Sequence, residues 1–372
     1  MNCHLKGLNV VCFKTKKIYK FVLPSKDDNL FFLTKKFKSL NKNTLLVGGE
    51  GYIGVVVRDF FLKKKINVTS IDKLIYSQKY NKISKNHKNY KFINTNFTSK
   101  VVSKLINSGK IDNLVILAGL VGDPITKKYP KISKKINYSS MKKLIDIALK
   151  NNVKKLIFVS TCSNYGVVRN GKIAKENTNL DPRSIYAKNK VMIERYLNNK
   201  KNNATEITIL RFATAFGFSK RMRFDLTINQ FVREIIVKKK IEVYDPFTWR
   251  PYCHVKDFAY LIYLIVSKKK VKRKQIEIFN SGSSKNNMNK MMIIKKISKF
   301  FNKFDLIIKK NSDDPRNYKV DFSKVKKIYG FTPKISIEKG IKELIYQIKK
   351  KKLTNLNYYK DKLGNYKIHK NV

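Results

Sequence analysis

A tyrosine and a lysine four residues apart are the side chains of this sequence best suited to acid and base chemistry. Tyr186 and Lys190 lie in residues 185–199, where apolar spacing predicts a helix, and one helical turn places both on the same face. A phenol in isolation ionises at about pH 10, and a fixed ammonium group nearby favours its ionised form. Thr161 adds a hydroxyl group that can bond to the same substrate oxygen. The three side chains could remove an alcohol proton while hydride leaves the carbon, or return the proton in the reverse direction.

Hydride transfer needs an acceptor, and a glycine-rich segment indicates which one. Residues 48–54 read GGEGYIG, directly after an apolar strand and at the start of a predicted helix. Glycines at these positions allow a tight turn, a close approach to a pyrophosphate and close helix packing, while the helix N-terminus attracts phosphate. Asp72 ends the next strand, where its carboxylate can accept from a ribose 2′-hydroxyl and would repel a 2′-phosphate. We therefore expect NAD rather than NADP, with Gly48, Gly51, Tyr52, Ile53, Gly54, Asp72, Tyr186 and Lys190 among its ligands.

Two further loops begin where predicted strands end. Asn96 and Phe97 follow the third strand, and Ala118 and Gly119 follow the fourth. Open α/β sheets bind ligands at the carboxyl ends of their strands, so these four residues are also predicted to contact the cofactor. The alternative is that they belong to ordinary strand-end loops.

The apolar pattern predicts the elements that must position these side chains. Short apolar runs alternate with segments of helical period, which is typical of β-α-β units and a parallel sheet. The fold class is therefore α/β, a Rossmann-type doubly wound parallel sheet with a smaller C-terminal substrate-binding lobe. The predicted strands cover residues 44–47, 68–71, 90–93, 114–117, 156–159 and 207–210, and the predicted helices cover residues 53–65, 132–150, 185–199, 226–237, 257–266 and 287–300.

We divide the chain into four parts. Residues 1–42 show no clear period and form an N-terminal extension, expected to be poorly ordered; the alternative is a start assigned too far upstream. Residues 43–215 form the NAD-binding domain. Residues 216–348 form the substrate-binding lobe, with segments that return to the NAD domain. Residues 349–372 are polar and are expected to form a loosely attached tail.

The composition is that of a folded protein with an unusual charge. Hydrophobic residues make up 42% of the 372 residues, and the formal net charge is +57. Such a charge suggests a polyanion partner, but only 11 of the 82 basic residues are arginine, the side chain that specific phosphate recognition favours. Lysine, asparagine and isoleucine are abundant throughout, which is typical of an AT-rich genome. No specific nucleic-acid partner is therefore expected.

Neither a disulfide framework nor a metal site is predicted. The four cysteines are scattered and show no CxxC spacing. No apolar run approaches the roughly 20 residues of a membrane span, and the N-terminus does not resemble a signal peptide. These features favour the cytoplasm.

Taken in this order, the glycine segment, Thr161, Tyr186 and Lys190 resemble the extended short-chain dehydrogenase/reductase family of NAD-dependent sugar-nucleotide epimerases and dehydratases. The likeness extends over residues 44–344, and further matching segments read LAGLVGDP, LRFAT and RPYCHVKD. The resemblance implies that Thr161, Tyr186 and Lys190 form a catalytic triad. It also implies a nucleotide-diphosphate sugar substrate contacted by Thr161, Thr214 and Arg250, and a homodimer.

Three departures from the family pattern bear on the reaction. The 4,6-dehydratases carry Asp and Glu after the catalytic threonine, whereas this sequence has Cys162 and Ser163, which supply no carboxyl group for water elimination. Thr214 stands where UDP-glucose 4-epimerases have asparagine, and Asn96 replaces an aspartate that commonly contacts adenine. Dehydration is therefore disfavoured, and the identity of the sugar stays open.

Arginines concentrate at the start of the second lobe, in the segment KRMRFDLTIN. Arg221 and Arg223 of this segment, with Arg250 and Arg316, are predicted to form a clamp for the substrate diphosphate, because the guanidinium group binds phosphate with two donors. Asn229 is a further predicted substrate ligand. The alternative for Arg221 and Arg223 is a charged turn that faces water.

The sequence thus predicts an NAD-dependent oxidoreductase or epimerase acting on a nucleotide-diphosphate sugar by hydride transfer at one sugar carbon. In an epimerase the ketone would present its other face and take the hydride back, so that NAD is regenerated. A net NAD(P)-dependent reductase or dehydrogenase and a 4,6-dehydratase are the alternatives in the same family. A non-catalytic NAD- or polyanion-binding protein is the alternative from another class; the charge favours it and the intact triad disfavours it.

Overall fold

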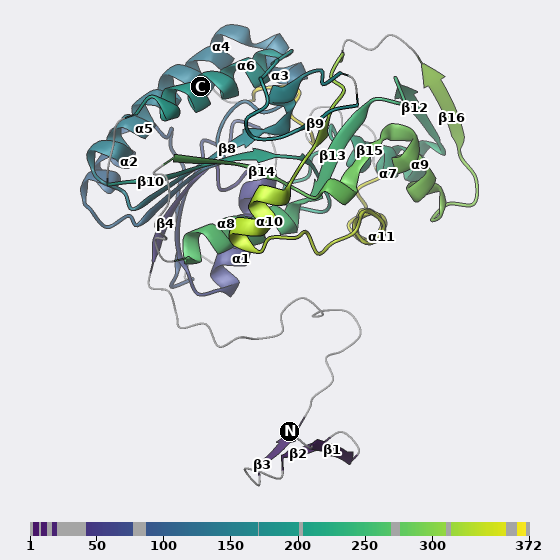
Figure 1. Cartoon of the computed structure of the whole chain (residues 1–372), viewed down its shortest axis with the longest axis horizontal. Helices are drawn as coiled ribbons and strands as arrows, with labels where there is room; N and C mark the ends of the chain where they lie inside the picture. The colour runs from purple at the N-terminus through teal and green to yellow at the C-terminus, as the bar shows by residue number, and fades with distance from the viewer. Residues whose placement is uncertain are drawn as a thin grey trace. The chain divides into compact units, whose positions relative to one another are not determined.

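The computed structural model describes three short N-terminal strands and most of the chain after residue 41 (Figure 1), namely residues 42–76, 87–169, 171–200, 204–268, 276–309, 314–354 and 363–369. The chain forms two compact units, Met1–Ser39 and Leu40–Val372. In the first unit, an antiparallel sheet is formed by β1 (Cys3–Lys6), β2 (Asn9–Cys12) and β3 (Lys17–Lys20). These strands were not predicted, because four residues carry too few side chains for a period to show. The rest of the predicted N-terminal extension before residue 42 lies outside the described residues.

Seven parallel strands form the central sheet of the second unit, in the order β14-β10-β8-β7-β4-β5-β6. The six strands expected from the sequence are among them, and β14 was missed. The sheet confirms the Rossmann-type doubly wound α/β fold, and its chain order reverses between β4 and β7. The strands are β4 (Asn43–Val47), β5 (Asn67–Ile71), β6 (Tyr90–Ile93), β7 (Asn113–Ile116), β8 (Lys155–Thr161), β10 (Glu206–Phe212) and β14 (Ile276–Ser281).

Helices cover both faces of this sheet (Figure 1). One face carries α1 (Tyr52–Lys63) and α8 (Val255–Ser267), and the other carries α2 (Lys100–Asn107), α5 (Met141–Lys150) and α6 (Ile185–Asn198). Phe61 of α1 packs with Phe258 of α8 in one core cluster, whereas Ile106, Leu144 and Ile193 pack in another. The strands between the two clusters are therefore buried on both sides, which explains their continuous apolar runs.

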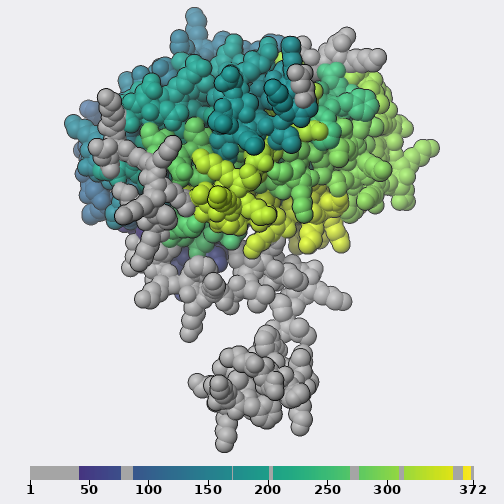
Figure 2. Space-filling model, viewed as in Figure 1, coloured from purple at the N-terminus to yellow at the C-terminus, as the bar shows by residue number. Residues whose placement is uncertain are grey.

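The second lobe is built around a core of its own. It contains α7 (Thr227–Lys238), α9 (Lys290–Ser298) and α11 (Ile337–Lys350), the sheet β11 (Thr214–Phe216), β13 (Trp249–His254) and β15 (Asn287–Asn289), and the parallel pair β12 (Lys240–Tyr244) and β16 (Asp305–Lys309). The segment α10 (Ser323–Tyr329) returns to the first lobe, where Val325 packs in the same cluster as Phe258. Figure 2 shows the yellow-green residues of α10 and α11 on the surface between the two lobes. Among the described residues, every helix is too short or too polar to cross a bilayer.

The C-terminal residues 363–369 are not the loosely attached tail that we expected. Leu363 and Asn365 are buried, and the carbonyl of Leu363 accepts a 2.8 Å hydrogen bond from the backbone N–H of Phe224. The Asn365 side-chain amide donates to the carbonyl of Val121 at 2.8 Å. These contacts are mostly made by single polar or backbone groups, which leave no apolar period for sequence analysis to find.

Candidate functional site

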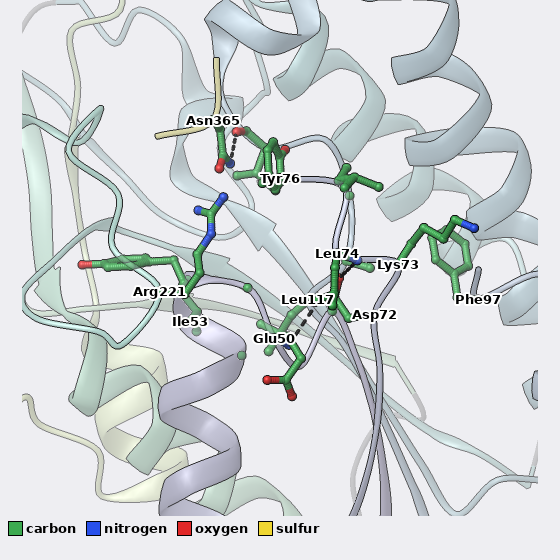
Figure 3. Close-up of a pocket in the computed structure, with 18 of the residues that line it drawn as sticks. Glu50, Ile53, Asp72, Lys73, Leu74, Tyr76, Phe97, Leu117, Arg221 and Asn365 are labelled. Atoms are coloured by element: carbon green, nitrogen blue, oxygen red, sulfur yellow. Dashed lines mark hydrogen bonds between the residues drawn. The ribbon is translucent and has the colours of Figure 1, made fainter. Parts of the chain in front are cut away.

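A pocket opens at the carboxyl ends of β4, β5 and β7, where the strand order reverses (Figure 3). Every residue predicted to bind the cofactor lines this pocket: Gly48, Gly51, Tyr52, Ile53, Gly54, Asp72, Asn96, Phe97, Ala118, Gly119, Tyr186 and Lys190. Arg223, which was predicted to bind substrate, lines it as well. The structure thus brings the expected cofactor set together; the contacts of each residue with NAD stay a prediction.

The glycine loop forms a cradle that side chains would fill. Gly48 has a φ of +83°, and a Cβ there would lie 2.6 Å from the backbone nitrogen of Ala118. A Cβ on Gly54 would collide with the carbonyl oxygen of Gly48. Helix α1 begins after Gly51 without a side-chain cap, and the residues of its first turn, Tyr52, Ile53 and Gly54, line the pocket. Such a helix start fits a pyrophosphate group.

The carboxylate of Asp72 is held at the pocket wall by backbone donors (Figure 3). Its two oxygens accept hydrogen bonds from the N–H groups of Glu50, at 3.1 Å, and Leu74, at 2.8 Å. Burial raises the pKa of Asp72, and the two backbone bonds oppose that shift. The carboxylate is thus oriented where a ribose hydroxyl group could donate to it, as the sequence predicts.

A π-helical turn (Lys135–Ser140) fixes the loop after β7. Its Asn137 side chain accepts from the N–H of Leu120 at 2.8 Å and donates to the carbonyl of the same residue at 2.9 Å. A Cβ on Gly119, whose φ is +148°, would lie 2.8 Å from the Asn137 carbonyl oxygen. The loop therefore needs both the glycine and the asparagine. Sequence analysis found only the glycine, because a buried asparagine inside a helical period resembles an exposed one.

Tyr186 and Lys190 lie one turn apart on α6 and face the pocket. The Lys190 Nζ donates to the carbonyl of Val159 at 2.7 Å and lies 5.9 Å from the centre of the Tyr186 ring. Ser184 caps the helix, because its hydroxyl accepts from the N–H of Ala187 at 3.2 Å. The cap and the lysine contact hold the first turn of α6 against the end of β8.

Burial governs the pKa values of this pair. Desolvation lowers the pKa of Lys190 to about 8, and the nearby carboxylate of Glu194 only partly opposes it. Burial also raises the pKa of Tyr186, against the attraction of Arg223 for the phenolate. Loss of hydration is thus the largest influence on the pKa of Tyr186. The stabilisation of its phenolate by Lys190 stays a prediction.

A buried ion pair behind the tyrosine and lysine was not predicted. Glu194, on α6, accepts from Arg211 of β10 at 2.7 and 3.0 Å and from the Asn164 amide at 2.8 Å, and the Ser160 hydroxyl donates to it as well. Both charged side chains are almost fully buried. The network joins α6 to β8 and β10 and so positions Tyr186 and Lys190. Its signal in the sequence is a charged residue at an apolar position of each element.

Thr161 ends β8 next to the pocket and is not part of its lining. Its hydroxyl oxygen accepts from the N–H of Ser163 at 3.1 Å, which leaves its own proton free to be donated. Cys162 points away into the core, where its thiol bonds to the carbonyl of Arg211 at 3.2 Å and burial raises its pKa. Of the two residues that replace the dehydratase carboxylates, only Ser163 thus lies toward the site.

The four arginines of the predicted clamp fall into separate groups. Arg316 pairs with Asp123 at 2.5 Å and with Asp314 at 2.6 Å, and Arg250 pairs with Asp314 at 3.1 Å. Arg316 also donates to the Ser163 hydroxyl at 3.0 Å.

The other two arginines of the clamp line the cofactor pocket. Arg223 pairs with Asp225 at 2.5 Å, and Arg221 stacks on the ring of Tyr76 with its guanidinium carbon 4.6 Å from the ring centre. Arg223 and Arg316 both act on the charge of Tyr186. A single clamp of four arginines is therefore not what the structure shows.

Asn229 and Thr214, like Thr161, Arg250 and Arg316, are predicted substrate ligands that lie outside the pocket lining. Asn229 is fully buried; its oxygen accepts from the N–H of Gly217 at 2.9 Å, and its amide donates to the Arg223 carbonyl at 3.0 Å and the Tyr52 hydroxyl at 3.1 Å. Thr214 lies in β11, paired with β13. The polar groups of Asn229 are thus used within the protein, so it acts by positioning Tyr52 and Arg223 rather than by direct contact.

Residues 44–282 match the model of the NAD-dependent epimerase/dehydratase family. The chain belongs to this family. The chain is similar to UDP-glucuronate 4-epimerase of Thermodesulfobacterium geofontis, with 27% identity over 323 residues that cover 81% of this chain and 94% of the relative. The family is one of NAD-dependent enzymes, so this chain is an enzyme with NAD as its cofactor, and the non-catalytic alternative is set aside.

Solved structures share this fold. UDP-N-acetylglucosamine 4-epimerase from Methanobrevibacter ruminantium, in complex with UDP-N-acetylmuramic acid, superimposes with a TM-score of 0.72 at 24% identity, over 82% of this chain and 99% of that one. UDP-glucose 4-epimerase of Thermus thermophilus, in complex with NAD, superimposes with a TM-score of 0.71 at 19% identity, over 82% and 99%. These two similarities show a shared fold, and the match to the family model confirms the expected resemblance to NAD-dependent epimerases and dehydratases.

Proposed function

We propose that this protein is an epimerase of a nucleotide-diphosphate sugar, acting by NAD-dependent hydride transfer at one sugar carbon. The observation that carries the proposal is the position of Tyr186 and Lys190 in the dinucleotide pocket. The absence of a carboxyl group at positions 162 and 163 favours oxidation and reduction over elimination of water. The relatives named as UDP-sugar epimerases support UDP as the nucleotide.

Each residue of the triad has a separate task in this proposal. The Tyr186 hydroxyl, once ionised, accepts the proton of a sugar hydroxyl, and the Thr161 hydroxyl donates to the same oxygen. When bound, NAD supplies the acceptor for the hydride that leaves the carbon. Protonated Lys190 stabilises the tyrosine phenolate. In the return step Tyr186 gives the proton back after the hydride reaches the other face of the ketone.

The sugar and its diphosphate would lie between Tyr186 and the group around Arg316. Asp123 and Arg316 face each other here, and one oxygen of the Asp123 carboxylate is buried without a hydrogen-bond partner among the described residues. An unpaired buried oxygen is costly, and a sugar hydroxyl could satisfy it. Arg223 and Arg316 supply positive charge on the same side. We therefore assign substrate contacts to Thr161, Arg223 and Arg316, with Arg250 orienting the Arg316 backbone through its carbonyl.

The test is to incubate the full-length protein with UDP-, GDP-, CDP- and dTDP-sugars, with and without added NAD. Products are separated by chromatography, and NADH is followed by its absorbance. An isomeric sugar nucleotide without net NADH is expected. NADH formed in proportion to product would instead establish a dehydrogenase, and a product lighter by one water would establish a dehydratase. The same preparation, analysed by light scattering, tests the homodimer that the resemblance implies.

A further inference from the structure

One cation in the dinucleotide pocket, Arg221, comes from the substrate-binding lobe and makes no direct ion pair among the described residues. Arg221 lines the pocket and is only 6% exposed. Its Nη2 has no hydrogen-bond partner within the part of the chain that the structure describes. Its neighbour Arg223 differs, because two of its nitrogens bond to the carboxylate of Asp225. A buried guanidinium without such a partner is costly to the fold, so an anionic ligand is the natural explanation.

The segment that carries Arg221 is attached directly to the start of α1. The hydroxyl of Ser219 donates to the carbonyl of Tyr52 at 2.8 Å, and the Tyr52 hydroxyl donates to the carbonyl of Gly217 at 2.6 Å. The N–H of Arg221 then bonds to the same Ser219 hydroxyl at 3.3 Å. These bonds fix the backbone of Arg221 beside the N-terminus of α1, which follows the glycine loop directly. Figure 3 shows its side chain passing Ile53 and its guanidinium group directed toward Tyr76 and Asn365.

The groups around Arg221 only partly offset the loss of its hydration. Burial lowers the pKa of Arg221 to about 10, and Arg223 acts in the same direction, whereas Tyr76, Asp225 and Asp72 oppose the shift. The carboxylate of Asp72 on the far side is already held by two backbone N–H groups. The ring of Tyr76 stacks on the guanidinium and orients it.

We propose that Arg221 binds the pyrophosphate of the dinucleotide, so that the substrate-binding lobe contributes a ligand to the cofactor. This differs from the sequence-based expectation, which assigned Arg221 to the substrate diphosphate. Both ligands carry a diphosphate, but only that of the dinucleotide is expected at the start of α1. Because the lobe that grips the sugar also grips the cofactor, the cofactor is retained while the sugar ketone is formed and reduced.

The test compares four full-length proteins stripped of bound nucleotide: wild type, Arg221→Met, Arg221→Lys and Lys220→Met. Lys220 is the matched control, since its side chain is half exposed, pairs with Asp59 and does not line the pocket. The affinities for NADH, ADP-ribose, adenosine and UDP are measured by calorimetry or fluorescence. These binding measurements need no turnover, so a failure of the proposed epimerase reaction leaves them interpretable.

Arg221→Met is expected to weaken NADH and ADP-ribose binding by about 10- to 100-fold, the range for hydrogen bonds to a charged group. Adenosine and UDP affinities should change by less than about twofold, and Lys220→Met should match wild type. Arg221→Lys should fall between the two, because it keeps the charge and loses the fork of donors. The nucleotide-free Arg221→Met protein should melt no lower than wild type, since the change removes an uncompensated buried charge.

Three results would overturn the proposal. Unchanged ADP-ribose affinity in Arg221→Met would exclude contact with the cofactor. A loss of UDP affinity with ADP-ribose binding intact would assign Arg221 to the substrate diphosphate. A lower melting temperature without nucleotide, combined with ADP-ribose affinity equal to wild type in Arg221→Lys and Arg221→Met, would make the residue structural.

Discussion

The cofactor side and the sugar side of the active site are built by different means. On the cofactor side, glycines, strand ends and a helix N-terminus present backbone groups, and Asp72 is held by two backbone N–H groups. On the sugar side, the groups are side chains from distant segments, as in the contacts of Arg316 with Asp123 and Ser163. Backbone geometry tolerates few sequences, whereas a set of paired side chains can be exchanged. The backbone-built half therefore suits a cofactor that a whole family shares, and under the proposed function the half built from side chains would select the sugar.

The largest effect is expected from Tyr186→Phe, which acts where the two sides meet. Loss of a general acid and base should lower kcat by about 10²- to 10⁴-fold, while NADH affinity stays within about twofold of wild type. Tyr196→Phe, on the same helix but with its hydroxyl at the surface beside Asp146, is the control and should retain full activity. Steady-state rates and NADH titrations check both. Substantial turnover by Tyr186→Phe would remove the tyrosine from the mechanism.

Gly54→Ala should impair cofactor binding and leave the sugar side intact. Its Cβ would collide with the Gly48 carbonyl, so the loop must shift and NADH affinity should fall by about 100-fold or more. Gly109→Ala is the control: φ is +68° and nothing lies within 4 Å of the new Cβ, so it should cost about 1 kcal/mol of stability without loss of NADH binding. Equal NADH affinity in the two variants would contradict the assignment of the glycine loop to the pyrophosphate of the cofactor.

Arg316→Met should impair binding of the sugar nucleotide and leave cofactor binding intact. Removing its charge and its bond to Ser163 is expected to raise KM for the sugar nucleotide by about 10- to 100-fold, with NADH affinity unchanged. Arg183→Met removes a surface arginine paired with Asp181 and serves as the control. Initial rates over a range of substrate concentrations provide the measurement. If Arg316→Met weakened NADH binding to the same extent, the two sides would not be separable.

Asp72→Asn tests how the cofactor side distinguishes NAD from NADP. The amide oxygen can still accept from a backbone N–H, but the negative charge that repels a 2′-phosphate is lost. The preference for NAD over NADP should therefore fall by about tenfold. Competition titrations with NAD and NADP measure it. An unchanged preference would assign the discrimination to another residue of the pocket.

The smallest effect concerns pH. Because burial raises the pKa of Tyr186, the fraction ionised, and with it kcat for sugar oxidation, should increase with pH through the neutral range. The increase should level off as Lys190, with a pKa of about 8, loses its proton and no longer stabilises the phenolate. Lys190→Met should move the rising limb upward by about one pH unit. A pH profile of kcat that is flat from about pH 6 to 9 would contradict this assignment.

The limits of prediction from sequence follow the same division. The glycine segment, Asp72 and the loops after β6 and β7 could be placed because a chemical need for glycine or a strand end leaves a local pattern. The role of Asn229 could not, because a polar residue near a site looks the same whether it meets substrate or a backbone N–H. The seventh strand, β14, was missed since it joins the sheet only after a long excursion through the other lobe. The pairing of Arg316 with Asp123 joins residues 193 positions apart, and no local sequence pattern indicates such a pair.

The buried pair of Glu194 and Arg211 constrains how this sequence can change over time. Loss of either member would leave the other charge buried and uncompensated, at a cost of about 3–5 kcal/mol, which is comparable to the stability of a whole domain. A substitution at Glu194 or Arg211 alone should therefore be strongly destabilising. In an alignment of homologues the two columns should vary together, exchanging an acid and a base for a neutral pair in one event or keeping both. Lineages that carry only one of the two should be rare, and those should also differ at Asn164.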